Sequence, residues 1–143
     1  MTTTRISFFL LTAVVSWTQT PEPVVSLADT QQRALTSAKI GQRYELLVSL
    51  PAGYAKSGES YPVLYVLDGW HPALMVFIQE NNVYSKRMRP VIIVNVSHGA
   101  TDYMALRARD FTPTRTPREA NSGGAAAFLE FLEYELIPFV DRT

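Results

Sequence analysis

Hydrophobic and polar residues alternate along one early segment, and two later segments are hydrophobic almost without interruption. In residues 44–50, Tyr, Leu, Val and Leu occupy every second position, the period of a strand with one buried face. Residues 62–67 (PVLYVL) and 91–96 (VIIVNV) are short runs rich in β-branched residues, typical of strands buried on both faces. Residues 27–36 are also compatible with a strand, although their pattern is weaker.

Two segments have hydrophobic residues at helical spacing. Residues 73–88 predict a helix between the two buried runs, so that strand, helix and strand form a βαβ unit. Residues 125–140 predict an amphipathic helix, which Pro138 is expected to kink or end. The apolar face of this second helix consists of Phe128, Phe131, Leu132 and Leu136.

A polar segment, residues 102–121, separates the second buried run from the amphipathic helix. It contains Pro113, Pro117 and four arginines. We expect a long loop without regular structure, a kind of segment that is usually functional or mobile in a compact domain.

The first 28 residues have the features of an export signal. A basic start at residues 1–5 precedes about twelve apolar residues, whereas a membrane span needs about twenty. We therefore predict a cleaved signal peptide and leader at residues 1–28, with an uncertain boundary, and a domain at residues 29–143 that is periplasmic or secreted. The alternative for the apolar run is a buried strand or helix.

Composition narrows the classes of partner and of site. Thirteen basic residues balance thirteen acidic ones without a run of either sign, so no basic stripe exists for nucleic acid or an anionic membrane surface. With hydrophobic residues at 47% and charged residues at 18%, the chain is expected to fold. Cysteine is absent, which excludes disulfides, cysteine-based zinc sites and a lipid-modified cysteine.

Five motifs occur in a series that resembles a known family. They are YPVLYVLDG (61–69), PVIIVNV (90–96), RDFTP (109–113), the glycine pair 123–124 and FLEFLEYELIPFVD (128–141). The series is similar to the putative esterase family of α/β hydrolases, and most of all to its siderophore (enterochelin-type) esterase branch. The resemblance implies an α/β fold with a mostly parallel sheet and flanking helices. It also implies hydrolysis of small-molecule carboxylic esters by serine, histidine and an acid, without a cofactor.

The same resemblance implies that the catalytic triad is missing from this chain. In the family the serine follows a helix like that of residues 128–140, on a G-x-S-x-G elbow, and the acid and histidine come later. The chain ends at Thr143, before such an elbow. We therefore expect the N-terminal half of an α/β-hydrolase fold, inactive alone and prone to self-association through an exposed sheet edge. Alternatives are a non-catalytic ligand-binding module and a half-domain that dimerises.

The loop at residues 68–71 is the implied source of an oxyanion-hole N–H group. Gly69 allows a sharp turn, and the N–H of Trp70 is the preferred donor. A plain tight turn with Trp70 on the surface is the alternative. Asp68 is expected to hold the loop through its carboxylate, and His71 is a candidate for substrate binding.

Arg109 and Asp110, at the start of RDFTP, are further substrate-binding candidates. A guanidinium at the mouth of the cleft could hold an acyl carboxylate or a carbonyl oxygen of the substrate. Alternatively, the pair only pins the long loop in place.

Two serines lie in contexts that superficially suggest a nucleophile. Ser97 follows a buried run, but Asn95 lies two residues before it, where an elbow needs a small residue, and the adjacent His98 could not act as its base. We interpret Ser97 as part of a turn. Ser122 follows a segment that cannot be a buried strand, and it is expected to cap the next helix.

A metal site is conceivable but matches no known spacing. Two histidines and two carboxylates follow the buried runs, and such side chains can ligate zinc. They are Asp68, His71, His98 and Asp102. Because their spacing fits no motif with a mechanism, we expect no metal at this position.

Overall fold

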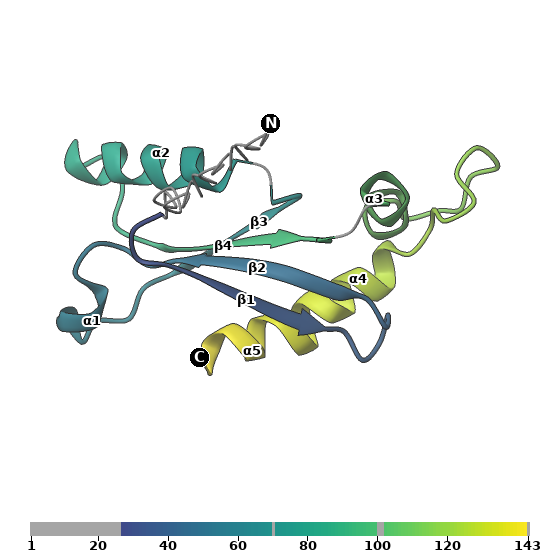
Figure 1. The fold of residues 1–143 in the computed structure, drawn as a ribbon, viewed down its shortest axis with the longest axis horizontal. Coiled ribbons are helices and arrows are strands. Elements are labelled where there is room, and N and C mark those ends of the chain that lie inside the picture. The colour runs from purple at the N-terminus through teal and green to yellow at the C-terminus, as the bar shows by residue number, and fades with distance from the viewer. Residues whose placement is uncertain (1–26, 70, 100–101, 143) are drawn as a thin grey trace, which may run out of the picture.

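The computed structural model describes residues 27–69, 71–99 and 102–142, and the expected signal peptide up to residue 26 lies outside this part. The described chain forms one four-stranded sheet with helices on both faces (Figure 1). The long C-terminal helical segment covers one face, and a single helix lies over the other. The α/β fold class is therefore confirmed. No helix within the described ranges is long and apolar enough to cross a membrane.

The sheet contains every strand that the hydrophobic pattern predicted. The strands are β1 (Thr30–Thr36), β2 (Arg43–Ser49), β3 (Val63–Leu67) and β4 (Ile92–Ser97), in the order β1-β2-β4-β3. Only β3 and β4 pair in parallel; β1 with β2 and β2 with β4 are antiparallel. The described sheet is thus mixed rather than mostly parallel, because a short turn joins β1 to β2 and only β3 and β4 are linked by a helical crossover.

The helices agree with the sequence except in the polar segment. They are α1 (Tyr54–Ser57), α2 (Pro72–Tyr84), α3 (Tyr103–Phe111), α4 (Ala125–Phe131), the π-turn η1 (Leu132–Leu136) and α5 (Ile137–Asp141). The expectation of a structureless loop at residues 102–121 is wrong for its first half, which is α3. Its residues are mostly good helix formers, but its one fully buried side chain is Asp110, so no apolar stripe marks the helix.

The C-terminal helical segment passes Pro138 without ending. Pro138 lacks an N–H group and its ring would clash with the carbonyl four residues earlier. The backbone widens into the π-turn just before it and then continues as α5 to Asp141. As predicted, the segment buries Phe128, Phe131 and Leu136, which pack on the sheet.

The hydrophobic core lies on the α4–α5 face of the sheet. Tyr44 is fully buried there, and its ring stacks on Phe131 with centroids 4.4 Å apart. The α2 face is thinner, because the only buried residue of α2 is Gln79, whose side chain accepts the Val91 N–H at 3.1 Å. Several large apolar side chains of α2 are exposed, among them Leu74 at 47% and Phe77 at 63%.

Candidate functional site

The turn after β3 has an unusual backbone. Asp68, Gly69 and His71 all have positive φ angles, of 74°, 60° and 54°. This conformation is uncommon outside glycine and is concentrated at functional sites. The turn lies at the carboxyl end of a parallel strand, where open α/β sheets bind their ligands. Trp70, the expected oxyanion donor, lies outside the described residues.

Gly69 packs directly against the end of β4. A Cβ atom at this position would lie 2.7 Å from Ser97 Cβ and 3.3 Å from Ser97 Cα. The positive φ and the lack of space together require glycine here. The contact fixes the turn after β3 on the carboxyl end of the neighbouring strand.

An ion pair joins the same turn to α3. Arg107 Nε donates to both carboxylate oxygens of Asp68, at 2.7 and 3.0 Å, and these hydrogen bonds raise the pKa of Arg107 above its ordinary value. Asp68 therefore binds another element through its carboxylate, in keeping with the role expected for it. Sequence reasoning missed Arg107. Both residues of this ion pair line an open pocket of about 370 Å³, together with Tyr103 and Met104.

Asp110, at the end of α3, is the centre of a buried polar network. Its side chain is fully buried. Oδ2 accepts hydrogen bonds from Tyr44 Oη at 2.7 Å, from His98 Nε2 at 2.9 Å and from Arg109 Nη2 at 3.1 Å. Oδ1 accepts from Arg109 Nε at 2.6 Å. The network joins β2, the end of β4 and α3 at one point.

The network keeps Asp110 ionised. Burial by itself raises the pKa of Asp110, but the hydrogen bonds from His98, Arg109 and Tyr44 outweigh it, and the net pKa lies below the ordinary value. Because an ionised carboxylate only accepts hydrogen bonds, His98 must carry a proton on Nε2. Burial, followed by the bond to Asp110, raises the pKa of Tyr44, which therefore stays neutral.

The buried network helps to distinguish the two roles considered for Arg109 and Asp110, which are binding of substrate and pinning of the polar segment. The structure brings them together with Tyr44 and His98, on the inner side of α3, and the Arg109 side chain is only 26% exposed. His71 and Asp68 belong instead to the turn after β3. The arrangement favours the alternative in which the pair pins α3.

The chain matches a family model over most of its length. The model is described as "Putative esterase" and covers residues 37–143. The chain belongs to this family of esterases. The resemblance noted from the motifs is thereby confirmed. No curated protein matches the chain in sequence.

Several solved structures share the fold of this chain. The BES protein from Bacillus cereus has a TM-score of 0.69 and 29% identity, over 87% of this chain and 50% of its own. An IroE-like serine hydrolase from Shewanella oneidensis has a TM-score of 0.64 and 34% identity, over 79% and 38%. The siderophore hydrolase EstB from Aspergillus nidulans has a TM-score of 0.69 over 85% and 45%, and at 24% identity it supports the fold alone. This esterase-family chain spans half or less of the length of these three structures.

Ser97 and His98 point to opposite faces of the sheet. Ser97 contacts Gly69, and its hydroxyl accepts the Gly99 N–H at 3.3 Å. His98 packs on the core side, 5.5 Å from the Tyr44 ring and bound to Asp110. Alternation along an extended strand explains this separation. The two side chains therefore form no nucleophile–base pair in this conformation.

Ser122 is not the cap of the following helix, contrary to expectation. The N-cap of α4 is Gly124, and no side chain caps this end. The Ser122 hydroxyl instead accepts the Thr116 N–H at 2.8 Å and donates to the Glu119 carbonyl at 2.6 Å. The residue closes the loop before α4, because the two glycines place it too far from the helix start.

The four residues considered for a metal site do not gather. His98 is committed to Asp110, and Asp68 to Arg107. Among the residues that the structure describes, no three histidine or acidic side chains come close enough to hold a metal ion.

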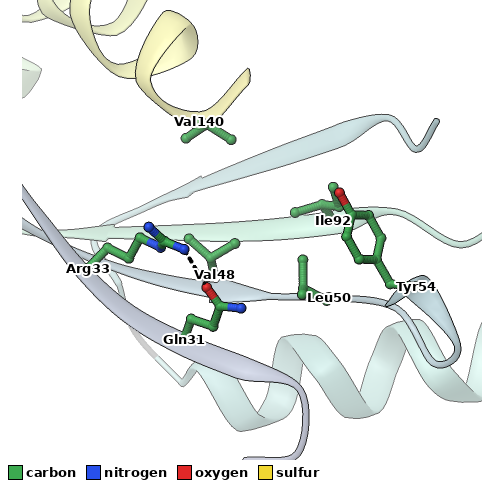
Figure 2. Close-up of a pocket in the computed structure, with 7 residues that line it drawn as sticks. All are labelled: Gln31, Arg33, Val48, Leu50, Tyr54, Ile92 and Val140. Carbon is green, nitrogen blue, oxygen red and sulfur yellow. Dashed lines mark hydrogen bonds between the residues drawn. The ribbon is translucent and has the colours of Figure 1, made fainter. Parts of the chain in front are cut away.

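A second hollow lies beside the end of α5, at the amino end of β4 (Figure 2). It lies at the opposite end of β4 from Ser97, and Figure 2 shows that Arg33 donates to Gln31, its neighbour on β1, at 2.7 Å. Its lining is Gln31, Arg33, Val48, Leu50, Tyr54, Ile92 and Val140. Because it holds neither a serine nor a histidine, it offers no nucleophile or base for ester hydrolysis.

Proposed function

We propose that this protein hydrolyses carboxylic esters, and that the turn after β3 forms the oxyanion side of its active site. The observation that carries the proposal is the positive φ of Asp68, Gly69 and His71, at the carboxyl end of β3, in a chain of the esterase family. The proposal places backbone N–H groups of this turn where negative charge develops on the carbonyl oxygen of the ester.

Serine-type ester hydrolysis requires a nucleophile, a base, an acid and an oxyanion site, and we assign these to different parts of the protein. A serine attacks the ester carbonyl while a histidine takes its proton and an acid orients the histidine. We assign the oxyanion to N–H groups of Gly69 and Trp70, and contact with the bound ester to His71. The serine, acid and base are proposed to lie outside the residues described here, in a region like the remaining half of the longer relatives.

The substrate class is proposed from the resemblance of this chain to the siderophore esterase branch of the family. The RDFTP motif and the glycine pair before the amphipathic helix are the features that resemble siderophore esterases. We therefore propose the ester bonds of an enterochelin-type siderophore as substrates. The name of the Shewanella oneidensis relative, an IroE-like serine hydrolase, supports serine chemistry.

The proposal is tested by assaying the chain alone and a fusion to the remaining half of the Bacillus cereus BES protein. We expect no hydrolysis of nitrophenyl acetate by the chain alone, and turnover of both nitrophenyl acetate and enterochelin by the fusion. A fusion that binds enterochelin without cleaving it would indicate a ligand-binding module instead. Saturable hydrolysis by the unfused chain that Ser97→Ala abolishes would make Ser97 the nucleophile and contradict the proposal.

We also propose that the protein is exported and that its leader is removed within residues 1–28. The apolar run in this leader is too short to span a membrane. Mass measurement of protein recovered from the periplasm or medium tests this. Recovery of exported protein with Met1 still in place would contradict it.

A further inference from the structure

Arg107 is held between two groups that restrict its guanidinium. On one side, its Nε donates to both carboxylate oxygens of Asp68. On the other, the guanidinium carbon lies 5.6 Å from the ring centroid of Phe111, within the range of a cation–π contact. Phe111 itself packs against His98 and Phe128, with centroids 5.8 and 5.4 Å apart. The support of Arg107 is therefore part of the core.

The helix that carries Arg107 has a fixed position. Three residues further along, Asp110 binds Tyr44 on β2 and His98 after β4. Residues three apart lie on neighbouring positions of a helix surface. The buried network thus sets where α3 lies, and with it where Arg107 meets Asp68.

The backbone conformation of Asp68 is stabilised by such a partner. Its φ of 74° costs free energy for a residue with a Cβ atom, although aspartate adopts this region more readily than most residues, so a contact that holds its carboxylate favours the observed conformation. Gly69, next to it, adopts its φ of 60° without this penalty. The ion pair is partly exposed, with side-chain exposures of 45% and 24%, so water screens it and its contribution to global stability is small. Its effect is on local geometry.

We propose that Arg107 is a positioning residue that holds Asp68 in its positive-φ conformation and so fixes the turn after β3. The conformational part of this inference stands on the contacts alone. Its catalytic consequence rests on the proposed function, in which the same turn faces the oxyanion.

The conformational part is tested by heteronuclear NMR of the chain. Arg107→Met should shift or broaden the amide resonances of Asp68, Gly69 and His71 and leave those of β2 and α4 in place. Arg87→Met, the same change at an exposed arginine beyond α2, is the matched control and should not affect the turn. Unchanged turn resonances in Arg107→Met, or equal changes in both variants, would overturn the inference.

A glycine at position 68 distinguishes the effect of the Arg107–Asp68 ion pair on the turn from other effects of Arg107. Glycine adopts a positive φ without help, so Asp68→Gly should keep the turn, and adding Arg107→Met to it should change nothing more. Arg107→Lys should restore the turn only in part, because an ammonium cannot reproduce the planar guanidinium contacts. A further shift of the turn in the double variant would show that Arg107 acts by another route.

Kinetics of the active fusion test the catalytic consequence. If Arg107 positions the turn, Arg107→Met should lower kcat about tenfold or more with KM within about twofold, as expected for an interaction made in the transition state. A rise in KM confined to anionic esters, with kcat unchanged, would show that Arg107 binds substrate and would contradict a positioning role. If Arg107→Met changes the turn resonances but the fusion is inactive, the proposed function is contradicted, whereas the conformational role of Arg107 is supported.

Discussion

The carboxylate of Glu135 accepts a hydrogen bond of 3.1 Å from the hydroxyl of Ser37, a residue almost one hundred positions earlier in the chain. The same carboxylate accepts the backbone N–H groups of Ala38, at 2.8 Å, and Lys39, at 3.1 Å. Glu135 lies on the π-turn of the C-terminal helix, and Ser37 lies in the turn between β1 and β2. One side chain thus joins the first hairpin of the sheet to the last helix.

Glu135→Gln should lower the free energy of unfolding by about 1–3 kcal/mol, because hydrogen bonds to a charged acceptor are replaced by weaker ones and one amide oxygen cannot serve all three donors. Urea unfolding of the chain measures this. Glu133→Gln, an exposed change on the same π-turn, should have little effect. Equal losses in the two variants would show that helix charge, rather than the contact with the hairpin, is responsible.

Removal of the Asp110 carboxylate should be among the most destabilising single changes in the chain. Asp110→Ala leaves Arg109 and His98 without their buried partner, and we expect a loss of about 3–5 kcal/mol. Tyr44→Phe removes one hydrogen bond to the carboxylate and should cost about 1.5–3 kcal/mol. Tyr84→Phe, at a position 89% exposed, is the control. Urea denaturation would contradict the prediction if Asp110→Ala matched that control.

The depressed pKa of Asp110 predicts a loss of stability in acid. Its pKa in the folded state lies below the ordinary value of 3.8, so the ionised form is favoured by folding. This contribution is complete above the unfolded pKa, at about pH 4 and higher, and is lost as the pH falls through the folded pKa. The difference in unfolding free energy between the wild type and Asp110→Asn should therefore shrink from pH 5 toward pH 2. A difference that stayed constant over that range would contradict the assignment.

Gly69→Val should lower ester hydrolysis by the fusion about 10²-fold or more, the scale of losing one oxyanion donor. The new side chain would meet Ser97 and displace the turn. Gly58→Val is the control, because Gly58 has a similar φ of 64° but no atom within 4 Å of an added Cβ. A second comparison uses Ser97→Gly, which should partly restore the activity of Gly69→Ala. Equal losses at Gly58 and Gly69 would show that unfolding, not the turn, lowers the rate.

Self-association of the chain remains a prediction, based on exposed apolar side chains on β3, an edge strand of the described sheet, and on helix α2. Leu64 on β3 is 46% exposed and Phe77 on α2 is 63% exposed. Sedimentation velocity should show association that Leu64→Lys weakens. Leu129→Lys, the same change at a 62% exposed position on α4, should leave it unchanged. A monomer at every concentration, or equal effects of the two lysines, would rule out the β3 edge as the contact.

The sequence by itself was sufficient to predict the strands and the helix that bury hydrophobic side chains. The alternation in residues 44–50 and the runs at 62–67 and 91–96 each became a strand, and the apolar face of residues 125–140 became the core contact. These patterns succeed because water excludes apolar side chains wherever they occur, so their spacing alone reports which face is buried. The glycine at position 69 was likewise readable, since a sharp turn after a buried strand favours glycine.

Only the tertiary structure decided the elements that are buried through polar contacts. The hydrophobic pattern did not predict helix α3, because the helix is held in place by Asp110. The burial of Asp110 depends on Tyr44, 66 positions away. The prediction that Ser122 caps the next helix was wrong, because its hydroxyl forms hydrogen bonds within its own loop instead. A charged or hydroxyl side chain is buried only where partners satisfy it, and those partners are brought together by the fold and not by their spacing in the sequence.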